Sequence, residues 1–485
     1  MATQPSPLGE RLDRSTTAAF AALLALGATL RAWLCFHDDG IYWPDEIYQS
    51  LEPAHRLVFG YGLIPWEFRE GARNWSFAGI VAALLRAVTW VGGDSPRYYL
   101  VAMRLVFSAL GMLTAFGVYR LARSCGARPL GAALGAVLFA LAPSAIYFAP
   151  RALSETGSAA ALVFGLALVW PKNAPIRATV VGTSLVGLSV LMRLQNATFC
   201  VGLLAVLLAR REWRRLTVAS LVATGWAILY GALDRLTWGT WFHAAIAYLR
   251  ANVVENKGAQ WGVSESTYFF RVFWTSMPWI AGLTVIFLVV AIPRAPGLFA
   301  ILALNLLMLS SVDHKEYRFA LPILPLAFAL AGLGYSTVAA WGERIRWDAR
   351  WIAGTAAAGA AVSGARFHEL TFGELGQYER ERPTASAFDD FGPLNRLLLV
   401  AHDQVDLCGI MIEAAHLAWT GGATYLHRPV PIYSRGDWRD SDHFNYVLTY
   451  GRPRGGRVVA SEGALSLINI APACTPDPSY RWWLP

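Results

Sequence analysis

Apolar stretches of membrane length recur along the chain from residue 17 to residue 364. A helix needs about 20 mainly apolar residues to span a bilayer, so one such stretch would indicate a signal peptide or an anchor. This many indicates a polytopic membrane protein with about eleven membrane helices. The expected helices lie near residues 17–36, 98–119, 129–148, 154–170, 178–193, 196–210, 216–233, 271–293, 296–312, 319–340 and 351–364.

Arginine residues mark one side of this predicted bundle. With eleven spans, the arginines beside spans one, two, six and ten all fall on the same side, which the positive-inside rule assigns to the cytosol. They are Arg11, Arg14, Arg120, Arg123, Arg210, Arg211, Arg214, Arg215, Arg344, Arg346 and Arg350. The opposite side then receives two long segments, residues 37–97 and 234–270, together with the C-terminal region.

The pattern changes from about residue 365, where charged residues, Pro and Gly become more frequent. We therefore expect two domains, a membrane domain over 1–364 and a small α/β domain over 365–485. Within the second domain, "NRLLLVAHD", "ATYLHR", "FNYVLTY" and "LSLINI" are interpreted as strands and "MIEAAHLAW" as a helix. Cys408 and Cys474 both lie in this region, and they could pair if it is outside the cytosol.

Composition supports the membrane interpretation. Charged residues make up 15% of the 485 residues, against about 25% in typical soluble domains. The net charge of +8 comes almost entirely from arginines between the apolar stretches, and no basic groove with interleaved aromatics is apparent, so nucleic acid is not an expected partner. The Arg-, Ala- and Gly-rich composition favours a bacterial inner membrane, with the endoplasmic reticulum as the location if the source is eukaryotic.

The side opposite the arginines gathers acidic and basic residues close to membrane depth, where each charge costs about 2.5–3.5 kcal/mol on insertion scales. Taken singly, the arginines could snorkel to headgroups and the others could form satisfied ion pairs. Together they indicate a functional site. The acidic stretch is "YWPDEIYQSLEPAH" (42–55), and the other members are Arg151, Arg193, Asp234, His314, Lys315, Glu316 and Arg318.

This combination of groups suits one kind of chemistry. Arginine and lysine side chains can hold a lipid phosphate, and a carboxylate can take the proton of an attacking hydroxyl. Trp and Tyr faces suit sugar rings and isoprenoid chains. The residues therefore point to glycosyl transfer from a lipid-phosphate sugar to an acceptor hydroxyl on the extracytosolic face.

The same residues resemble glycosyltransferase family 22, the polyprenyl- or dolichyl-phosphate-mannose-dependent mannosyltransferases of GPI-anchor and N-glycan assembly. The segment "WPDEIYQSLEPAHRLVFGYGLIPWEF" (43–68) is similar to the first external loop of that family, "DHKEYRFALPILPL" (313–326) to its His-Lys-Glu-x-Arg-Phe segment, and "DRLTWGTW" (234–241) to its Asp-Arg segment. Trp43 stands where the family has His, and "MRLQN" (192–196) lacks the family's Arg-Pro-Thr form.

The resemblance implies an all-α GT-C membrane fold and an inverting transfer of mannose without a required metal. It implies that Asp45 is the base. We expect Glu46 to orient the sugar or pair with an arginine, and Asp45, Gln49 and Glu52 to share one face of a short helix that starts at Pro44. A first group of residues, most of them cationic, is expected to bind the donor phosphate and sugar, and a second group of loop residues is expected to contact the acceptor. The first group comprises Lys315, Arg318, Arg193, Arg151, His314 and Glu316, and the second comprises Gln49, Glu52, His55, Trp66, Glu67 and Asp234.

Two alternatives remain open from the sequence. One is a GT-C enzyme that uses another lipid-linked sugar, such as arabinose or an amino sugar. The other is a non-enzymatic carrier or flippase of polyprenyl phosphate, which would not need Asp45. A metal site formed by Asp45, Glu46 and Asp234 has no specific spacing, so no cofactor is expected. The expected partners are membrane lipids, the lipid-linked donor and a glycan or glycolipid acceptor; the sequence leaves the oligomeric state open.

Overall fold

A computed structural model describes residues 12–377, 381–434, 442–451 and 456–484. The chain divides into two compact units. Unit 1 comprises residues 1–33, 107–150 and 154–385, and unit 2 comprises residues 34–106, 151–153 and 386–485. This division differs from the expected boundary at residue 364, because the C-terminal residues group with the first loop. Two helices, α1 (Arg14–His37) and α5 (Pro96–Ser124), contribute residues to both units.

Unit 1 is a helical bundle whose helices coincide with the predicted apolar stretches. Among the described residues, α1, α5, α11 and α16 are long and apolar enough to cross a membrane by length and composition. Most of the other helices of the bundle are apolar but shorter. The remaining helices of unit 1 are α6 (Pro129–Ala140), α7 (Pro143–Tyr147), α8 (Ser154–Val169), α9 (Ile176–Met192), α10 (Ala197–Ala209), α11 (Trp213–Trp238), α12 (His243–Leu249), α13 (Tyr268–Ser276), α14 (Pro278–Ala291), α15 (Pro296–Ser310), α16 (Leu324–Arg344) and α17 (Arg350–Ala365).

Prolines move several boundaries from their predicted places. The predicted spans 129–148 and 271–293 each consist of two helices, and the second helix of each pair begins at Pro143 or Pro278. Proline lacks an N–H and its ring clashes with the preceding turn, so it starts a helix more readily than it continues one. For the same reason the predicted span 319–340 begins only at Leu324, with Pro325 in its first turn.

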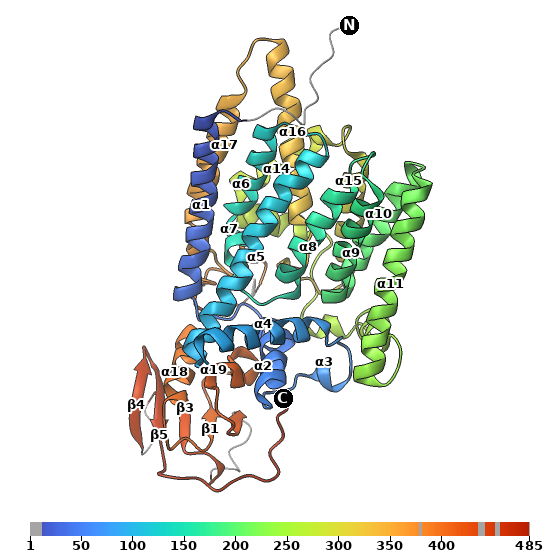
Figure 1. Cartoon of the computed structure of the whole chain (residues 1–485). Coiled ribbons are helices and arrows are strands. Elements are labelled where there is room, and N and C mark those ends of the chain that lie inside the picture. The colour runs from blue at the N-terminus through green and yellow to red at the C-terminus, as the bar shows by residue number, and fades with distance from the viewer. Residues whose placement is uncertain (1–11, 378–380, 435–441, 452–455, 485) are drawn as a thin grey trace. The chain divides into compact units, whose positions relative to one another are not determined.

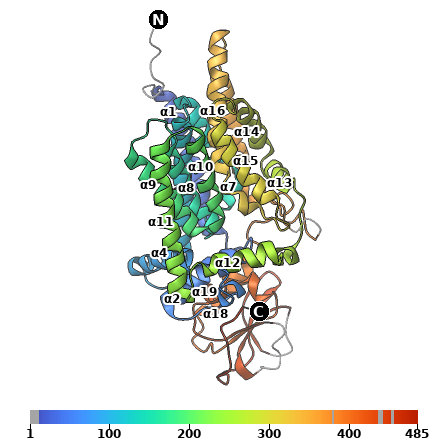
Figure 2. The same cartoon turned by 90° about the vertical axis from the view of Figure 1, so that its right-hand side faces the viewer.

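Small residues allow the helices of unit 1 to pack closely, as membrane helices often do. Helices α6 and α16 meet at Gly131 and Gly332, where a Cβ on either residue would lie about 2.5 Å from the carbonyl oxygen of the other helix. Gly165 of α8 and Gly182 of α9 make a similar mutual contact. Helix α16 packs against both α6 and α14 (Figure 1), and α9 packs against both α8 and α11 (Figure 2).

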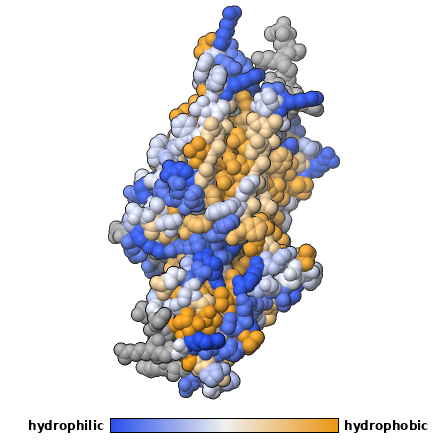
Figure 3. All heavy atoms as spheres, turned by 90° about the vertical axis from the view of Figure 1, so that its left-hand side faces the viewer, coloured by the Kyte–Doolittle hydropathy of each residue, from blue (hydrophilic) through white to orange (hydrophobic). Residues whose placement is uncertain are grey.

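The outer surface of unit 1 is apolar along much of its length. Figure 3 shows hydrophobic residues in a continuous band over one face of the helices. Large apolar side chains are exposed on several elements, such as Phe116 on α5, Leu221 on α11 and Val362 on α17. Exposed apolar surface of this extent is typical of contact with lipid, because water would disfavour it.

Unit 2 combines short helices with a five-stranded sheet of order β2-β1-β3-β5-β4. Strand β1 pairs parallel to β2 and β3, whereas β5 pairs antiparallel to β3 and β4. Cys408 and Cys474 form a disulfide in this unit. The elements are η1 (Ile47–Leu51), α2 (Glu52–Phe59), α3 (Trp66–Arg69), α4 (Ser76–Gly92), α18 (Gly392–His402), α19 (Gly422–Leu426), β1 (Ile410–Ile412), β2 (Ile432–Ser434), β3 (Tyr446–Tyr450), β4 (Arg457–Glu462) and β5 (Leu465–Asn469).

The C-terminal sheet was expected, but several of its predicted elements are wrong. "NRLLLVAHD" lies in α18 and "ATYLHR" overlaps α19, so both are helical, whereas "MIEAAHLAW" begins with strand β1. A short apolar run has no period that separates a buried strand from a buried helix turn. Pro393 in the first turn of α18 favours the helix. "FNYVLTY" and "LSLINI" are confirmed as β3 and β5.

Candidate active site

The acidic stretch after α1 forms a short helical segment, as the sequence predicts. The carbonyl of Pro44 accepts hydrogen bonds from the N–H groups of Ile47 and Tyr48, so Asp45 lies half-buried in the first turn. The helix then widens into the π-helix η1 (Ile47–Leu51). π-Helical turns are rare and occur often at functional sites. The wider turn also departs from the regular α-helix spacing that was expected to put Asp45, Gln49 and Glu52 on one face.

Glu46 fixes the backbone of this loop from within. Its Oε1 accepts hydrogen bonds from the N–H groups of Tyr42 (2.5 Å) and Trp43 (3.4 Å). Arg151 donates to both carboxylate oxygens of Glu46 at 2.9 Å and forms a second ion pair with Asp38, also at 2.9 Å. All three charged side chains are buried. Of the two roles expected for Glu46, pairing with an arginine is the one found here, and Arg151 forms ion pairs with two carboxylates.

Asp45 belongs to a pair of acidic groups with Glu67. Glu67 is 8% exposed, and the side-chain amide of Gln49 donates to its Oε1 at 2.8 Å. Burial and then the charge of Asp45 raise the pKa of Glu67 to about 7, against the opposing charge of Arg73. A carboxyl that titrates near neutral pH beside a half-buried aspartate is suited to proton transfer. Trp66, the residue before Glu67, is half-buried.

Glu52 and His55 have a different surrounding, because they bind the C-terminal segment of unit 2. Glu52 is fully buried and accepts four hydrogen bonds, from the N–H groups of Leu63, Ala423 and Thr424 and from the Thr424 hydroxyl. Nε2 of His55 lies 2.9 Å from Nδ1 of His427. Burial lowers the pKa of His55 to about 3. Glu52 and His55 therefore link the first loop to the C-terminal segment within unit 2. The contact of Glu52 with Ala423 joins positions 371 apart in sequence.

Unit 1 contains a second group of charged residues, here called the cationic cluster: Glu155, Arg193, His314, Glu316 and Arg318. The fully buried carboxylate of Glu155 accepts from Arg193 at 2.6 Å and from Arg318 at 3.2 Å. Arg318 also donates to both oxygens of Glu316, at 2.6 and 3.0 Å. The cluster brings together residues from α8, from the end of α9 and from the segment before α16.

His314 is the half-buried member of the cationic cluster, and the buried Lys315 follows it in the sequence. The ring of His314 contacts Oε1 of Glu316 at 2.9 Å and the carbonyl of Gly262 at 3.1 Å. Burial alone would lower the pKa of His314, but the hydrogen bond and the charge of Glu316 outweigh it and the pKa is raised. Lys315 donates to the carbonyl of Ser264 at 2.8 Å. His314 therefore favours its charged form, and the next residue in the sequence is Lys315.

Asp234 has a local structural contact. It is fully buried, and its Oδ2 accepts a hydrogen bond from the N–H of Ala244 at 2.9 Å, near the start of α12. Sequence reasoning gave Glu155 no role in the site and did not assign Asp38, Thr424 or His427 to it. Glu155 could have been found from charge balance, because two buried arginines need a buried anion; the others carry no such signal.

Among the described residues, no group of three or more His, Cys, Asp or Glu side chains is arranged to hold a metal ion. The expectation of a reaction without a metal stays a prediction.

The fold of this chain is similar to that of a solved membrane-lipid complex. The crystal structure of ArnT from Cupriavidus metallidurans, bound to undecaprenyl phosphate, covers 96% of this chain and all of that chain with a TM-score of 0.61 and 13% identity. The apo structure of the same protein gives a TM-score of 0.59. The likeness is one of fold, and it confirms the expected GT-C architecture with a small C-terminal sheet.

Sequence comparison identifies the family. Residues 22–375 match the model of the Alg9-like mannosyltransferase family, and the chain belongs to that family. It is 26% identical over 333 residues to GPI alpha-1,2-mannosyltransferase 3 of Xenopus laevis and 27% identical over 332 residues to the Homo sapiens protein of that name. Each alignment covers 66% of this chain, and the chain spans 61% and 58% of the length of those two relatives.

Proposed function

We propose that this protein is an integral-membrane mannosyltransferase that moves mannose from a polyprenyl-phosphate donor to a hydroxyl of a glycan or glycolipid. The observation that carries the proposal is the family match over residues 22–375, which contains both the Asp45 loop and the cationic cluster. The named relatives act in GPI mannosylation, which favours mannose as the sugar and a glycolipid as the acceptor. The undecaprenyl phosphate bound to ArnT favours a polyprenyl-phosphate donor.

The reaction divides into two chemical tasks. Asp45 takes the proton of the acceptor hydroxyl, supported by Glu67 in the same loop. His314, Lys315 and Arg318 stabilise the charge that develops on the leaving polyprenyl phosphate. Inversion at the anomeric carbon requires one base and one leaving group, so no second nucleophilic carboxylate is needed. Glu46 and Arg151 keep the Asp45 loop in place.

We place the reaction on the extracytosolic face of the membrane, in a bacterial inner membrane or, in a eukaryote, in the endoplasmic reticulum. Two observations support this side. The arginine-rich ends of the helices are expected in the cytosol, opposite the Asp45 loop. The disulfide between Cys408 and Cys474 belongs to the same unit as that loop, and disulfides persist in oxidising compartments.

The experiment compares sugar lipids by mass spectrometry in cells with and without the protein, and then tests the purified protein with defined donors. Polyprenyl-phosphate mannose should be consumed, with one hexose gained by the acceptor. Consumption of a polyprenyl-phosphate arabinose or amino sugar in its place would identify a different lipid-linked sugar. Movement of the donor across vesicle membranes without sugar transfer would contradict the proposal and favour a carrier.

A further inference from the structure

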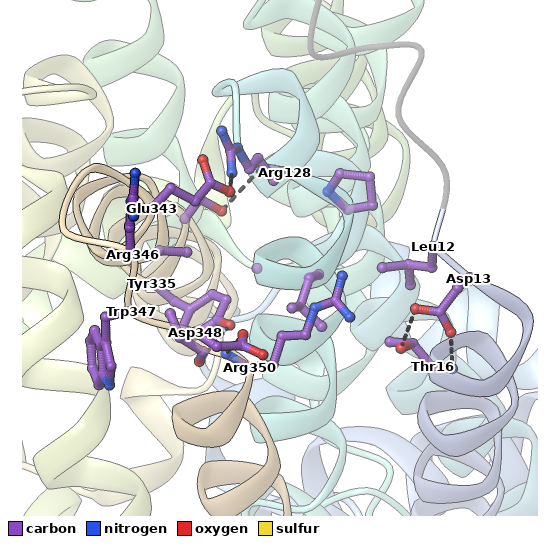
Figure 4. Close-up of a pocket in the computed structure, with 16 residues that line it drawn as sticks. Leu12, Asp13, Thr16, Arg128, Tyr335, Glu343, Arg346, Trp347, Asp348 and Arg350 are labelled. Atoms are coloured by element: carbon purple, nitrogen blue, oxygen red, sulfur yellow. Dashed lines mark hydrogen bonds and ion pairs between the residues drawn. The ribbon is translucent and has the colours of Figure 1, made fainter.

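Unit 1 contains a pocket of about 640 Å³ at the end of the bundle where α1, α6 and α17 begin and α16 ends (Figure 4). None of its lining residues belongs to the Asp45 loop or to the cationic cluster. Its polar lining comprises Asp13, Thr16, Arg128, Ser336, Glu343, Arg346, Asp348 and Arg350, and its less polar lining includes Leu12, Leu130, Tyr335 and Trp347.

The acidic groups of this pocket are already held by contacts within the chain. Asp13 accepts hydrogen bonds from Ser15 and Thr16 at the start of α1. Glu343 forms an ion pair with Arg128, and the carboxylate of Asp348 accepts from the N–H of Arg350 at 2.9 Å. Each of these carboxylates thus has at least one oxygen engaged within the chain.

Two guanidinium groups lack such contacts. Within the part of the chain that the structure describes, the side chains of Arg346 and Arg350 make neither a hydrogen bond nor an ion pair. Figure 4 shows the Arg350 side chain reaching into the pocket and Arg346 on its rim. The first turns of α6 and α17 also line the pocket, and the N–H groups and dipole of a helix N-terminus favour an anion.

We propose that this pocket binds a phosphate group, with the guanidinium groups of Arg346 and Arg350 as its main donors. Guanidinium groups match phosphate oxygens in geometry and form charge-assisted hydrogen bonds with them. The less polar wall formed by Leu130, Tyr335 and Trp347 suits the remainder of a phospholipid headgroup at a membrane interface. The same chemistry would accept a free phosphate, so the experiment must separate the two sources.

The test uses the full-length protein in detergent, with binding measured by native mass spectrometry and by the shift of the unfolding temperature. The ligands are a short-chain phosphatidylglycerol, inorganic phosphate, and a diacylglycerol that has the same acyl chains without phosphate. The variants are Arg346→Gln, Arg350→Gln and the pair together. Arg344→Gln is the control, because this exposed arginine ends α16 but does not line the pocket.

We expect phosphatidylglycerol to bind wild-type protein and the Arg344→Gln control alike. It should bind the double variant about tenfold or more weakly, because that variant lacks both charged donors. Binding of inorganic phosphate with the same dependence would identify free phosphate as the ligand and still support the proposal. Equal binding of diacylglycerol, or unchanged binding by the double variant, would overturn it. Either single variant, each in an exposed position, serves if the double variant does not fold.

Discussion

The contacts of Glu52 predict that Glu52→Gln destabilises unit 2 without removing the chemistry. One oxygen of Glu52 accepts from Leu63 and Ala423 at 2.8 and 2.9 Å, and the other accepts from the N–H and hydroxyl of Thr424 at 2.8 and 2.5 Å. An amide keeps one acceptor oxygen, so two of these hydrogen bonds lose their acceptor. At about 1.5–3 kcal/mol for each bond to a charged group, the loss is about 3–6 kcal/mol.

The lower end of this range applies, because burial raises the pKa of Glu52 and because the Thr424 hydroxyl can turn and accept a hydrogen bond from the new amide. A loss of about 3 kcal/mol lowers the unfolding temperature of a unit of this size by roughly 6–12 °C. The assay is thermal unfolding of the detergent-solubilised protein, followed by intrinsic tryptophan fluorescence. Glu67→Gln is the matched control, since it makes the same substitution in the same loop at a carboxyl that accepts from Gln49 and whose pKa is already about 7.

The control should change the free energy of unfolding by less than about 1 kcal/mol, because a carboxyl with that pKa is partly uncharged at neutral pH. Below its unfolding transition, the Glu52→Gln protein should retain turnover within about tenfold of wild type. A fall in unfolding temperature no larger than that of Glu67→Gln would refute the assignment of Glu52 as a structural contact. So would a complete loss of turnover in a protein that is still folded.

Three further predictions concern the charged groups. The pKa of Glu67 is raised to about 7, so the Asp45–Glu67 pair holds a proton below that pH and turnover should rise with pH up to about 7. In a pH–rate profile, Glu67→Gln should move this rise in turnover to lower pH. A rise at unchanged pH would argue against coupling of the two acids. Glu155→Gln should destabilise unit 1 by about 3–5 kcal/mol, because it leaves the buried Arg193 and Arg318 with less anionic charge. In thermal unfolding, a Glu155→Gln/Arg193→Met double variant should recover part of that stability. Equal losses of stability in both variants would contradict the ion pair between Glu155 and Arg193. Turnover should survive EDTA, and a loss restored by a divalent cation would show that the metal-independent mechanism is wrong.

Much of the helical part of the fold could be predicted from the sequence, because membrane spans depend on local composition and length. Every predicted stretch corresponds to one helix or to a pair separated by a proline. The C-terminal region was harder, since the segments around Leu397 and Tyr425 are short apolar runs whose helical form depends on tertiary contacts. The sequence indicated a sheet in this region but not which segments are strands and which are helices.

The contacts between the candidate site residues could not be predicted from the sequence. Motif and topology named Asp45, Arg151 and Lys315 as candidate site residues, and their roles stay predictions. Motif and topology could not identify which cation neutralises which carboxylate, because that depends on three-dimensional packing: Arg151 pairs with Asp38 and Glu46. The contact of Glu52 with Thr424 likewise joins positions far apart in sequence, and neither local pattern nor charge indicates it.

The proposed role of Asp45 as the base of a mannosyl transfer is tested most directly by the turnover of Asp45→Asn with a polyprenyl-phosphate mannose donor. Asparagine has nearly the same shape but cannot accept the proton. We expect turnover to fall by about 10²–10⁴-fold, with an unfolding temperature and donor binding close to those of wild type. Wild-type turnover by a folded Asp45→Asn protein would contradict this role.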